Sequence, residues 1–240
     1  MNVPVWVSEA AAGFWRAVGG AEPFPRALRG PIRHGPFDLT VKEMPALGLC
    51  GVERYLAGLD IGWRCGEPDR PLRACLAARD GAGFIFLDAG DPPGERTFSL
   101  AHELAHFLGH YWLPRRRACQ LLGEGAGGAL DGQRPPTPAE RARAALAGVS
   151  LGLHVHLMQR GPRRAVPGGV VAATEEEADR LAYELLAPGA VVAARAGPTS
   201  GRARVVEVLR DGFRLPPDRA AEYAEILVPA PVVHPLLRRL

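Results

Sequence analysis

The chain has 240 residues, of which 47% are hydrophobic and 23% are charged, as is usual for a globular protein with a sizeable core. Its formal net charge of +3 at pH 7 is too small to indicate nucleic acid binding. Its four cysteines form no CxxC pair, so neither a disulfide scaffold nor a cysteine zinc site is expected. The sequence shows no signal peptide and no apolar run of about 18 residues, and we therefore expect a cytoplasmic protein.

The first 45 residues are broken by many glycines and prolines, which predicts an arm wrapped on the main body. One short helix is expected in this arm, around Ser8 to Val18. A second helix is expected from Pro45 to Leu59, because apolar residues recur there at helical spacing.

Two strands are predicted next, over residues 72–78 and 83–88. The turn between them contains Asp80-Gly81, and Asp-Gly between two apolar runs is a strong signal for a hairpin. The second strand has two open interpretations. It is either a core strand or an exposed sheet edge beside a cleft, to which an extended peptide could add as a further strand.

The stretch from Phe98 to Trp112 reads FSLAHELAHFLGHYW and predicts a buried helix. His102 and His106 are four residues apart, so both imidazoles lie on one face of that helix and can bind one metal ion. Glu103 follows the first histidine and can reach a water molecule on that metal. The HExxH spacing is therefore typical of a zinc site with two histidine ligands and a general base.

A catalytic zinc ion usually has three protein ligands and one open position, so a third ligand is required. In the extended motif HExxHxxGxxH the third ligand is a histidine three residues after the glycine. Gly109 matches that glycine, but the ligand position is occupied by Trp112, so the extended motif is not present. His110 lies one turn beyond His106, but ligands at i, i+4 and i+8 drift round a straight helix by about 40° per step. We therefore expect His110 to orient a ligand or contact substrate, or to be an ordinary helix-end histidine.

The segment from 113 to 170 separates this helix from the next one that carries candidate ligands. Its glycine- and proline-rich part, residues 120–136, predicts a loop over the site. Thr137 and Glu140 form a capping box, which predicts a helix that runs to about Gly148.

Two histidines near the end of this segment alternate with apolar residues in the sequence LGLHVHLM. His154 and His156 are two residues apart, so on a strand their side chains share one face and can bind a metal together. No further ligand lies near them in sequence, and we therefore expect an inert pair rather than a metal site.

The helix TEEEADRLAYELLAP, Thr174 to Pro188, offers acidic candidates for the third ligand. Glu175 and Asp179 are four residues apart and face the same way, so Glu175 could bind the metal while Asp179 holds a ligand histidine. In the alternative interpretation, Thr174 and Glu177 form a capping box and the acidic residues only suit a helix N-terminus.

Together the two helices resemble the ImmA/IrrE family of metallopeptidases, whose members typically have an FTLAHELGH-type segment and, later, an E-x-x-A-N/D segment that runs into F-A-x-x-L-L-M-P. The matching residues here are Arg96, Phe98, Leu100, Ala101 and HELAH, and then Glu175, Ala178, Asp179, Leu181, Ala182, Leu185, Leu186 and Pro188. Ala187 replaces the usual methionine, and the separation between His106 and Glu175 is longer than usual in the family. These matches cover roughly a fifth of the chain.

This resemblance implies a zincin-like α+β fold, in which a small antiparallel or mixed sheet packs on the HExxH helix together with further helices. It implies one zinc ion per chain, held by His102, His106 and Glu175, with Glu103 as general base. The choice of Glu175 over Glu177 rests on the E-x-x-A-D register of related zinc peptidases. The candidates for a supporting role, or for stabilising the oxyanion of the transition state, are Asp179, His110, Tyr111 and Tyr183.

We expect one zincin-like domain over residues 1–190, which includes the 1–45 arm and the 113–170 insertion between the ligand-bearing helices. Residues 191–240 are expected to form a small extension with two short helices. The second of these helices has no basic recognition face, so we expect the pair to pack on the protein rather than to bind DNA.

The resemblance also implies a substrate, because members typically cleave a helix-turn-helix repressor at one site and so switch on genes of stress response or mobile elements. We expect an endopeptidase that cleaves such a cytoplasmic regulator, in which Glu103 takes a proton from metal-activated water. Binding to nucleic acid or to a membrane is not expected. The alternative is a metal-binding regulatory module that recognises a repressor or antitoxin without cutting it, but a purely structural site has no need of Glu103 as a base.

Overall fold

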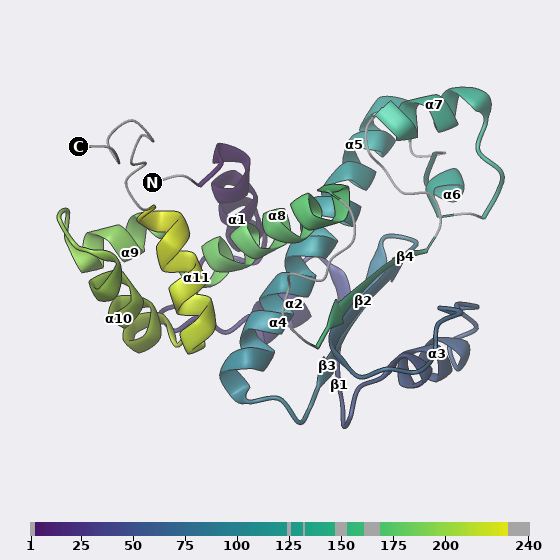
Figure 1. Cartoon of the computed structure of the whole chain (residues 1–240). Helices are drawn as coiled ribbons and strands as arrows, with labels where there is room; N and C mark the ends of the chain where they lie inside the picture. Colours follow the sequence, from purple (N-terminus) through teal and green to yellow (C-terminus); the bar gives the residue numbers. More distant parts are fainter. Residues whose placement is uncertain (1–2, 124–125, 132, 147–152, 161–168, 230–240) are drawn as a thin grey trace, which may run out of the picture.

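The computed structural model describes residues 3–123, 126–131, 133–146, 153–160 and 169–229. In this part of the chain, helices surround one four-stranded sheet (Figure 1). The strands are β1 (Asp38–Met44), β2 (Leu72–Arg79), β3 (Ala82–Asp88) and β4 (His154–Gln159), in the order β1-β3-β2-β4. β1 runs parallel to β3, and the other neighbouring pairs are antiparallel. The expected α+β fold with a small mixed sheet is confirmed.

The hairpin between β2 and β3 turns at Asp80-Gly81, as the sequence predicts. Asp80 has a φ of 57° and Gly81 a φ of 82°, and two positive φ angles are what a two-residue type I′ turn requires. β3 lies between β1 and β2, so the interpretation of this strand as an exposed edge is wrong. The edges of the described sheet are β1 and β4.

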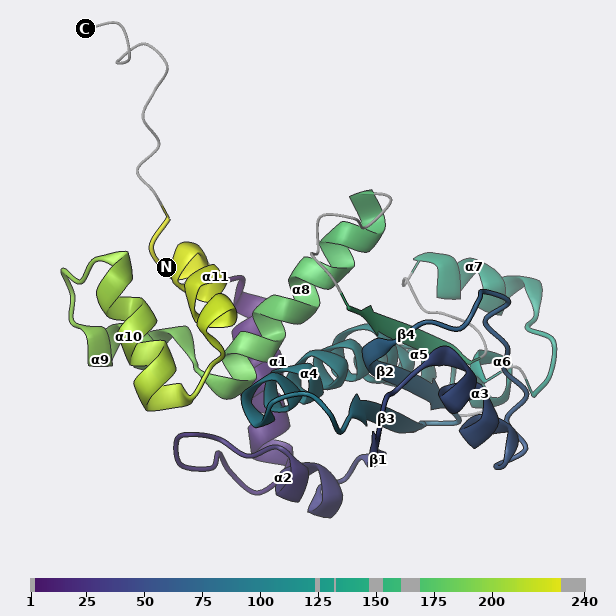
Figure 2. The same cartoon turned by 60° about the horizontal axis from the view of Figure 1, so that its bottom comes forward.

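Side chains of β2 and β3 alternate between two buried clusters, because successive residues of a strand point to opposite faces. Leu76 and Ile85 belong to the larger cluster, to which the HELAH helix α4 contributes. Cys75 and Phe86 belong to the smaller cluster, which α3 (Leu49–Ala57) covers. Figures 1 and 2 show α3 and α4 on opposite sides of the sheet. The alternation therefore gives the sheet two covered faces.

The helix α4 (Pro93–His106) lies between the sheet and α8 (Gly169–Leu186). Proline at the start of α4 suits a helix N-terminus, because its missing N–H would have no partner there. All residues from Phe98 to His106 are buried. The chain then continues through a π-helical segment, Phe107–Trp112, into α5 (Leu113–Leu122). The HELAH motif is thus held on both sides by packed elements.

The other helices lie around this central layer. They are α1 (Val5–Ala17), α2 (Arg29–His34), α6 (Gly127–Leu130), α7 (Pro138–Leu146), α9 (Gly189–Ala196), α10 (Arg202–Phe213) and α11 (Pro217–Leu227). The helices α9–α11 gather at the C-terminal end of α8, and α5–α7 lie on the opposite side of the molecule (Figures 1 and 2). Among the described helices, none combines the length and apolar character that crossing a bilayer would need.

Three predictions from the sequence need correction. The last residues of the expected N-terminal arm form the strand β1 and not an irregular arm. Most side chains of β1 are exposed, so the sequence shows no clear alternation of apolar and polar residues there. The helix expected from Pro45 to Leu59 is the shorter α3. The loop expected over residues 120–136 contains the end of α5 and the whole of α6.

The capping box before α7 is confirmed. The Glu140 N–H donates to Thr137 Oγ1 at 3.2 Å, and the Thr137 N–H donates to Glu140 Oε2 at 2.7 Å. The helix is described as far as Leu146, so its expected end near Gly148 lies outside the described residues.

Leu104 lies on the buried face of α4, and its side chain is fully enclosed. We expect Leu104→Ala to lower the free energy of unfolding by about 2–5 kcal/mol, because the deletion leaves a cavity in the main core. Urea denaturation would measure this change. The matched control is Leu121→Ala on α5, where the side chain is 71% exposed and the expected change is within about 0.5 kcal/mol. Equal changes for both variants would contradict the described packing of α4.

Candidate metal centre

Four side chains converge beside α4: His102, His106, His156 and Glu175. One possible ligand atom from each of them lies within 4.8 Å of the others. The four residues come from three different elements, α4, β4 and α8. The centre therefore depends on tertiary packing and not on the HExxH helix alone.

α4 and α8 place three of these donors at separations that suit a metal ion. The two Nε2 atoms of His102 and His106 lie 3.1 Å apart. Glu175 Oε2 lies 3.4 Å from His102 Nε2, and Glu175 Oε1 lies 3.4 Å from His106 Nε2. Ligand atoms in a tetrahedral zinc site with bonds of 2.0–2.1 Å are about 3.3–3.4 Å apart. The three donors thus fit a zinc ion without rearrangement of the helices.

The outer ring nitrogens of both histidines have partners of their own. His102 Nδ1 lies 2.8 Å from Asp179 Oδ1, so the Asp179 carboxylate can accept the Nδ1 proton. His106 Nδ1 lies 3.1 Å from His110 Nδ1. Such contacts fix the ring and leave Nε2 for the metal, as is usual for histidine ligands in metalloproteins. His110 lies in the π-helical segment that follows His106. The expectation for His110 assumed a straight α-helix, and the wider π-helical turn changes the direction of its side chain.

His156 enters the centre from the edge strand β4. It pairs opposite Leu76 of β2, so it faces the same side of the sheet as α4. Its Nε2 lies 2.7 Å from Glu175 Oε1, its Nδ1 lies 2.9 Å from Glu103 Oε2, and its ring stacks on His106 with centroids 3.6 Å apart.

The expectation of an inert histidine pair is therefore wrong for His156. His154 shares its face of β4 but lies beside Tyr111, with ring centroids 6.0 Å apart. The alternation in HVHLM did indicate which residues share a face. It could not indicate that β4 pairs with β2, and this pairing is what brings His156 to the HELAH helix.

Glu103 is fully buried at the inner side of the centre. Its Oε2 is bonded to His156, but its Oε1 has no hydrogen-bond partner among the described residues. Buried polar atoms nearly always have a partner, often an ordered water molecule. An orphaned carboxylate oxygen next to a set of histidine and carboxylate donors fits a metal ion that carries water, and this donor set suits zinc.

The charges of the centre are balanced by its own side chains. Burial alone would lower the pKa of His156, but the carboxylates of Glu103 and Glu175 raise it to about 10. Burial and the neighbouring His156 hold the pKa of His106 well below its ordinary value. Burial would raise the pKa of Glu175, but hydrogen bonds from the histidines lower it overall. The carboxylates thus favour positive charge here, and a metal ion competes with protons for the same donors.

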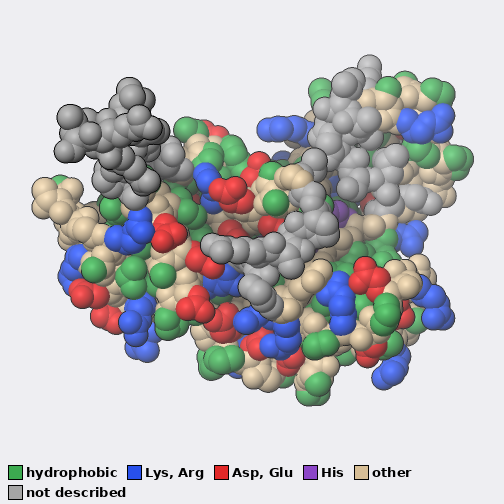
Figure 3. Space-filling model, in the orientation of Figure 1, with side chains coloured by type: hydrophobic (Ala, Val, Ile, Leu, Met, Phe, Trp, Pro, Cys, Tyr) green, Lys and Arg blue, Asp and Glu red, His purple; other side chains and the backbone are tan. Residues whose placement is uncertain are grey.

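The centre lies near the surface, although its histidines on α4 are buried. The side chain of Glu175 is 25% exposed and that of His156 is 15% exposed, whereas those of His102 and His106 are almost completely enclosed. Figure 3 shows some histidine surface, in purple, in the recess between the part that contains α5–α7 and the rest of the molecule. The partly exposed members of the group are thus those on α8 and β4.

The other residues proposed from the sequence lie in two groups. Asp179 and His110 contact the two α4 histidines, whereas the two tyrosine hydroxyls bind elsewhere. Tyr111 accepts the Gly81 N–H at 2.7 Å, at the β2–β3 turn, and its pKa is raised by burial to about 12. The Tyr183 hydroxyl donates to Glu222 of α11 at 3.0 Å.

The capping box proposed for Thr174 and Glu177 is wrong. α8 begins at Gly169, so Thr174 lies inside the helix and not at its N-terminus. Glu177 instead faces His110, with 3.6 Å between Glu177 Oε2 and His110 Nε2.

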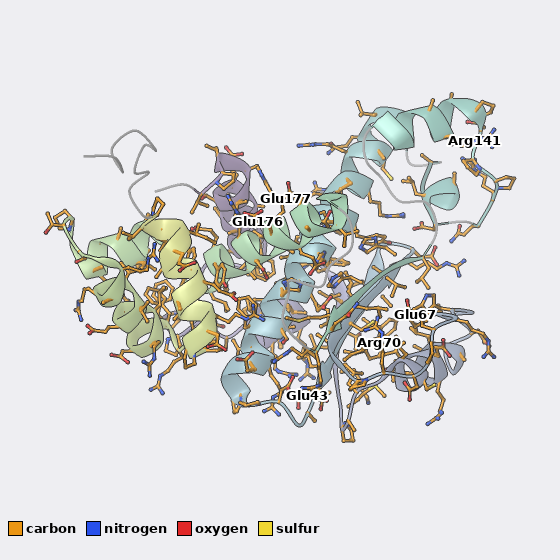
Figure 4. All side chains as sticks on the ribbon, in the orientation of Figure 1. Glu43, Glu67, Arg70, Arg141, Glu176 and Glu177 are labelled. Carbon is orange, nitrogen blue, oxygen red and sulfur yellow. The ribbon has the colours of Figure 1, made fainter. Side chains whose placement is uncertain are left out.

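We expect Asp179→Ala to weaken zinc binding about 10–100-fold, because His102 loses the carboxylate that orients its ring. Competition with a chromogenic chelator would measure the dissociation constant. The control is Glu176→Ala on the same helix, labelled in Figure 4, because the Glu176 side chain is 62% exposed and pairs with Arg180. Unchanged affinity in the Asp179 variant would show that His102 needs no such support.

Comparison with known proteins gives one family. Residues 70–126 match the family model Peptidase_M78, described as the IrrE N-terminal-like domain. No curated protein and no solved structure matches the chain. The matched stretch contains His102, Glu103 and His106 but ends before β4 and α8. Over this stretch the match confirms that the chain resembles the ImmA/IrrE family of metallopeptidases, through the IrrE N-terminal-like domain that carries the HELAH helix.

Proposed function

We propose that the chain is a zinc-dependent endopeptidase with one zinc ion, held by His102, His106 and Glu175. The observation that carries this proposal is the approach of the Glu175 carboxylate to within 3.4 Å of both HExxH histidines. These histidines lie in the stretch that matches a peptidase family model, and that match supports hydrolysis of peptide bonds.

When bound, a zinc ion supplies Lewis acidity, which polarises a peptide carbonyl and makes water a better nucleophile at neutral pH. Glu103 Oε1, buried and without a partner in the described part of the chain, accepts the proton of the attacking water. The same oxygen then returns this proton to the nitrogen of the leaving amine. The enclosed position of Glu103 favours this role, because bulk water is excluded around the carboxylate.

The other residues position this machinery. Asp179 orients His102 through its Nδ1, and His110 lies against Nδ1 of His106. In this proposal the ligands belong to one domain over residues 1–190, and residues 191–240 form an extension of it. The tyrosine hydroxyls are engaged by Gly81 and Glu222, so we assign neither to the transition state.

The substrate in this proposal is a cytoplasmic protein regulator, and a helix-turn-helix repressor is the first choice. The support for this choice is the family resemblance of the two motif helices, together with the match of residues 70–126. Cleavage of such a repressor at one site would relieve repression of its target genes, including genes of stress response.

One observation favours a second function, a regulatory module that binds metal and a repressor without cutting. Four side chains converge at the centre, and four protein ligands are typical of structural zinc sites. The position of Glu103 beside the centre favours the peptidase, because a structural site needs no base.

We expect Glu103→Gln to keep near one zinc ion per chain but to lower cleavage of the substrate at least about a hundredfold, because it removes the base. The substrates to test first are helix-turn-helix regulators encoded in the same genome, beginning with any encoded beside this gene, with cleavage followed by mass spectrometry. Full cleavage by the Gln variant would exclude Glu103 as the base. Binding without any cleavage by the wild-type protein would favour the regulatory module.

Metal content tests the ligands separately. We expect Glu175→Ala to lose the zinc ion, whereas Glu176→Ala retains it. A wild-type protein without metal after zinc is supplied would overturn the proposal as a whole.

A further inference from the structure

The third histidine of the centre shares features with the other two. In His102 and His106, Nδ1 contacts an outer partner and Nε2 faces the common centre. His156 resembles them in part: its Nδ1 is bonded to Glu103 Oε2, and its Nε2, which is within hydrogen-bond distance of Glu175 Oε1 at 2.7 Å, belongs to the same group of possible ligand atoms. A histidine that presents Nε2 inward while a carboxylate holds Nδ1 is oriented as a metal ligand.

The bond between His156 and Glu103 occupies one oxygen of the residue proposed as base. Glu103 Oε2 lies 2.9 Å from His156 Nδ1, and Glu103 is fully buried, so the imidazole is the described partner of the carboxylate. Glu103 Oε2 is engaged by His156, so Oε1 is the oxygen left to serve an attacking water. If His156 is a fourth protein ligand, however, it takes the position on the metal that catalysis leaves open for that water.

We propose that His156 is a fourth protein ligand that closes the metal centre, with Glu103 as its orienting carboxylate. The structure is then a resting state of the peptidase, and hydrolysis requires His156 to withdraw. This inference rests on the proposed function, because it requires the three-ligand zinc site. It adds to the three-ligand site a histidine that controls whether the fourth position on the metal is open.

The element that carries His156 is suited to such withdrawal. The ligands on α4 and α8 belong to helices packed in the main core. β4 is an edge strand of the described sheet with β2 as its neighbour, and of its six side chains Met158 is the buried one. Besides the pairing with β2, the end of β4 is held by ion pairs of Arg160. Its Nη1 lies 2.7 Å from Asp91 Oδ1, and its Nη2 lies 2.5 Å from Asp88 Oδ2. In this proposal, movement of β4 or rotation of His156 breaks its contacts with Glu175 and His106, while α8 and α4 continue to hold those two residues.

The test uses the full chain loaded with cobalt(II), whose visible absorption reports the ligands of the ion. Azide is added as a small ligand that needs an open position. We expect the wild-type spectrum to be unchanged by azide and the spectrum of His156→Ala to change. We also expect His156→Ala to bind cobalt at least about tenfold more weakly, because one ligand is lost.

The matched control is His154→Ala. His154 is the same residue type on the same strand and face, but it is outside the four-residue group. Its affinity and its response to azide should equal those of the wild type. His156→Gln serves as a second variant, and circular dichroism checks that both His156 variants are folded. If azide changes the wild-type and His156→Ala spectra alike, and both bind cobalt equally, the fourth-ligand proposal is overturned while the three-ligand site stands.

The role of Glu103 is tested by combining variants. We expect Glu103→Ala to weaken cobalt binding about tenfold when His156 is present and less than about threefold in the His156→Ala background. Equal losses in both backgrounds would show that Glu103 does not orient His156. A wild-type chain that binds no cobalt would overturn the proposed function itself, which is a different outcome from either of these.

Discussion

The packing of α8 across α4 is the contact on which the whole centre depends. α4 supplies two histidines at helical spacing, and α8 brings the Glu175 carboxylate to within 3.4 Å of both. The same crossing places Asp179 beside His102, so one packed interface supplies both the Glu175 carboxylate and a hydrogen-bond partner for His102. Buried residues such as Leu104, Leu181 and Leu185 hold this interface together. The geometry of the site is therefore a property of the hydrophobic core.

Much of this could be predicted from the sequence, because it follows from local periodicity. His102 and His106 share a face through the helical repeat, and the β2–β3 turn follows from Asp80-Gly81. Glu175 was proposed from its place in the E-x-x-A-D pattern, because its distance from His106 along the sequence gives no indication that the two residues meet. His156 was misjudged because its role depends on a strand pairing between distant parts of the chain, which residue spacing cannot show. β1 was missed for a related reason, since a mostly exposed strand has little apolar pattern.

The centre also illustrates how buried charge is tolerated. Glu103 and Glu175 lie close to three imidazoles, and each histidine contacts a carboxylate or a neighbouring ring. Buried charges are costly unless they are paired, and here protons on the histidines can balance the carboxylates when no metal is bound. The same set of side chains can therefore accept a metal cation without reorganisation of the fold, because the cation takes the place of protons on the histidines.

The long connection between the two ligand-bearing helices has a consequence for the diversity of such proteins. The entropy needed to close a loop rises only slowly with its length, by about 0.6 kcal/mol for each doubling. A connecting segment such as residues 113–168 can therefore lengthen with little loss of folding stability, because α4 and α8 still meet through their own core contacts. In this chain the connecting segment contributes α5, α6, α7 and β4 between two helices that pack on each other. Selection for new partners or new forms of control can act on this added segment while the chemistry of the core stays fixed.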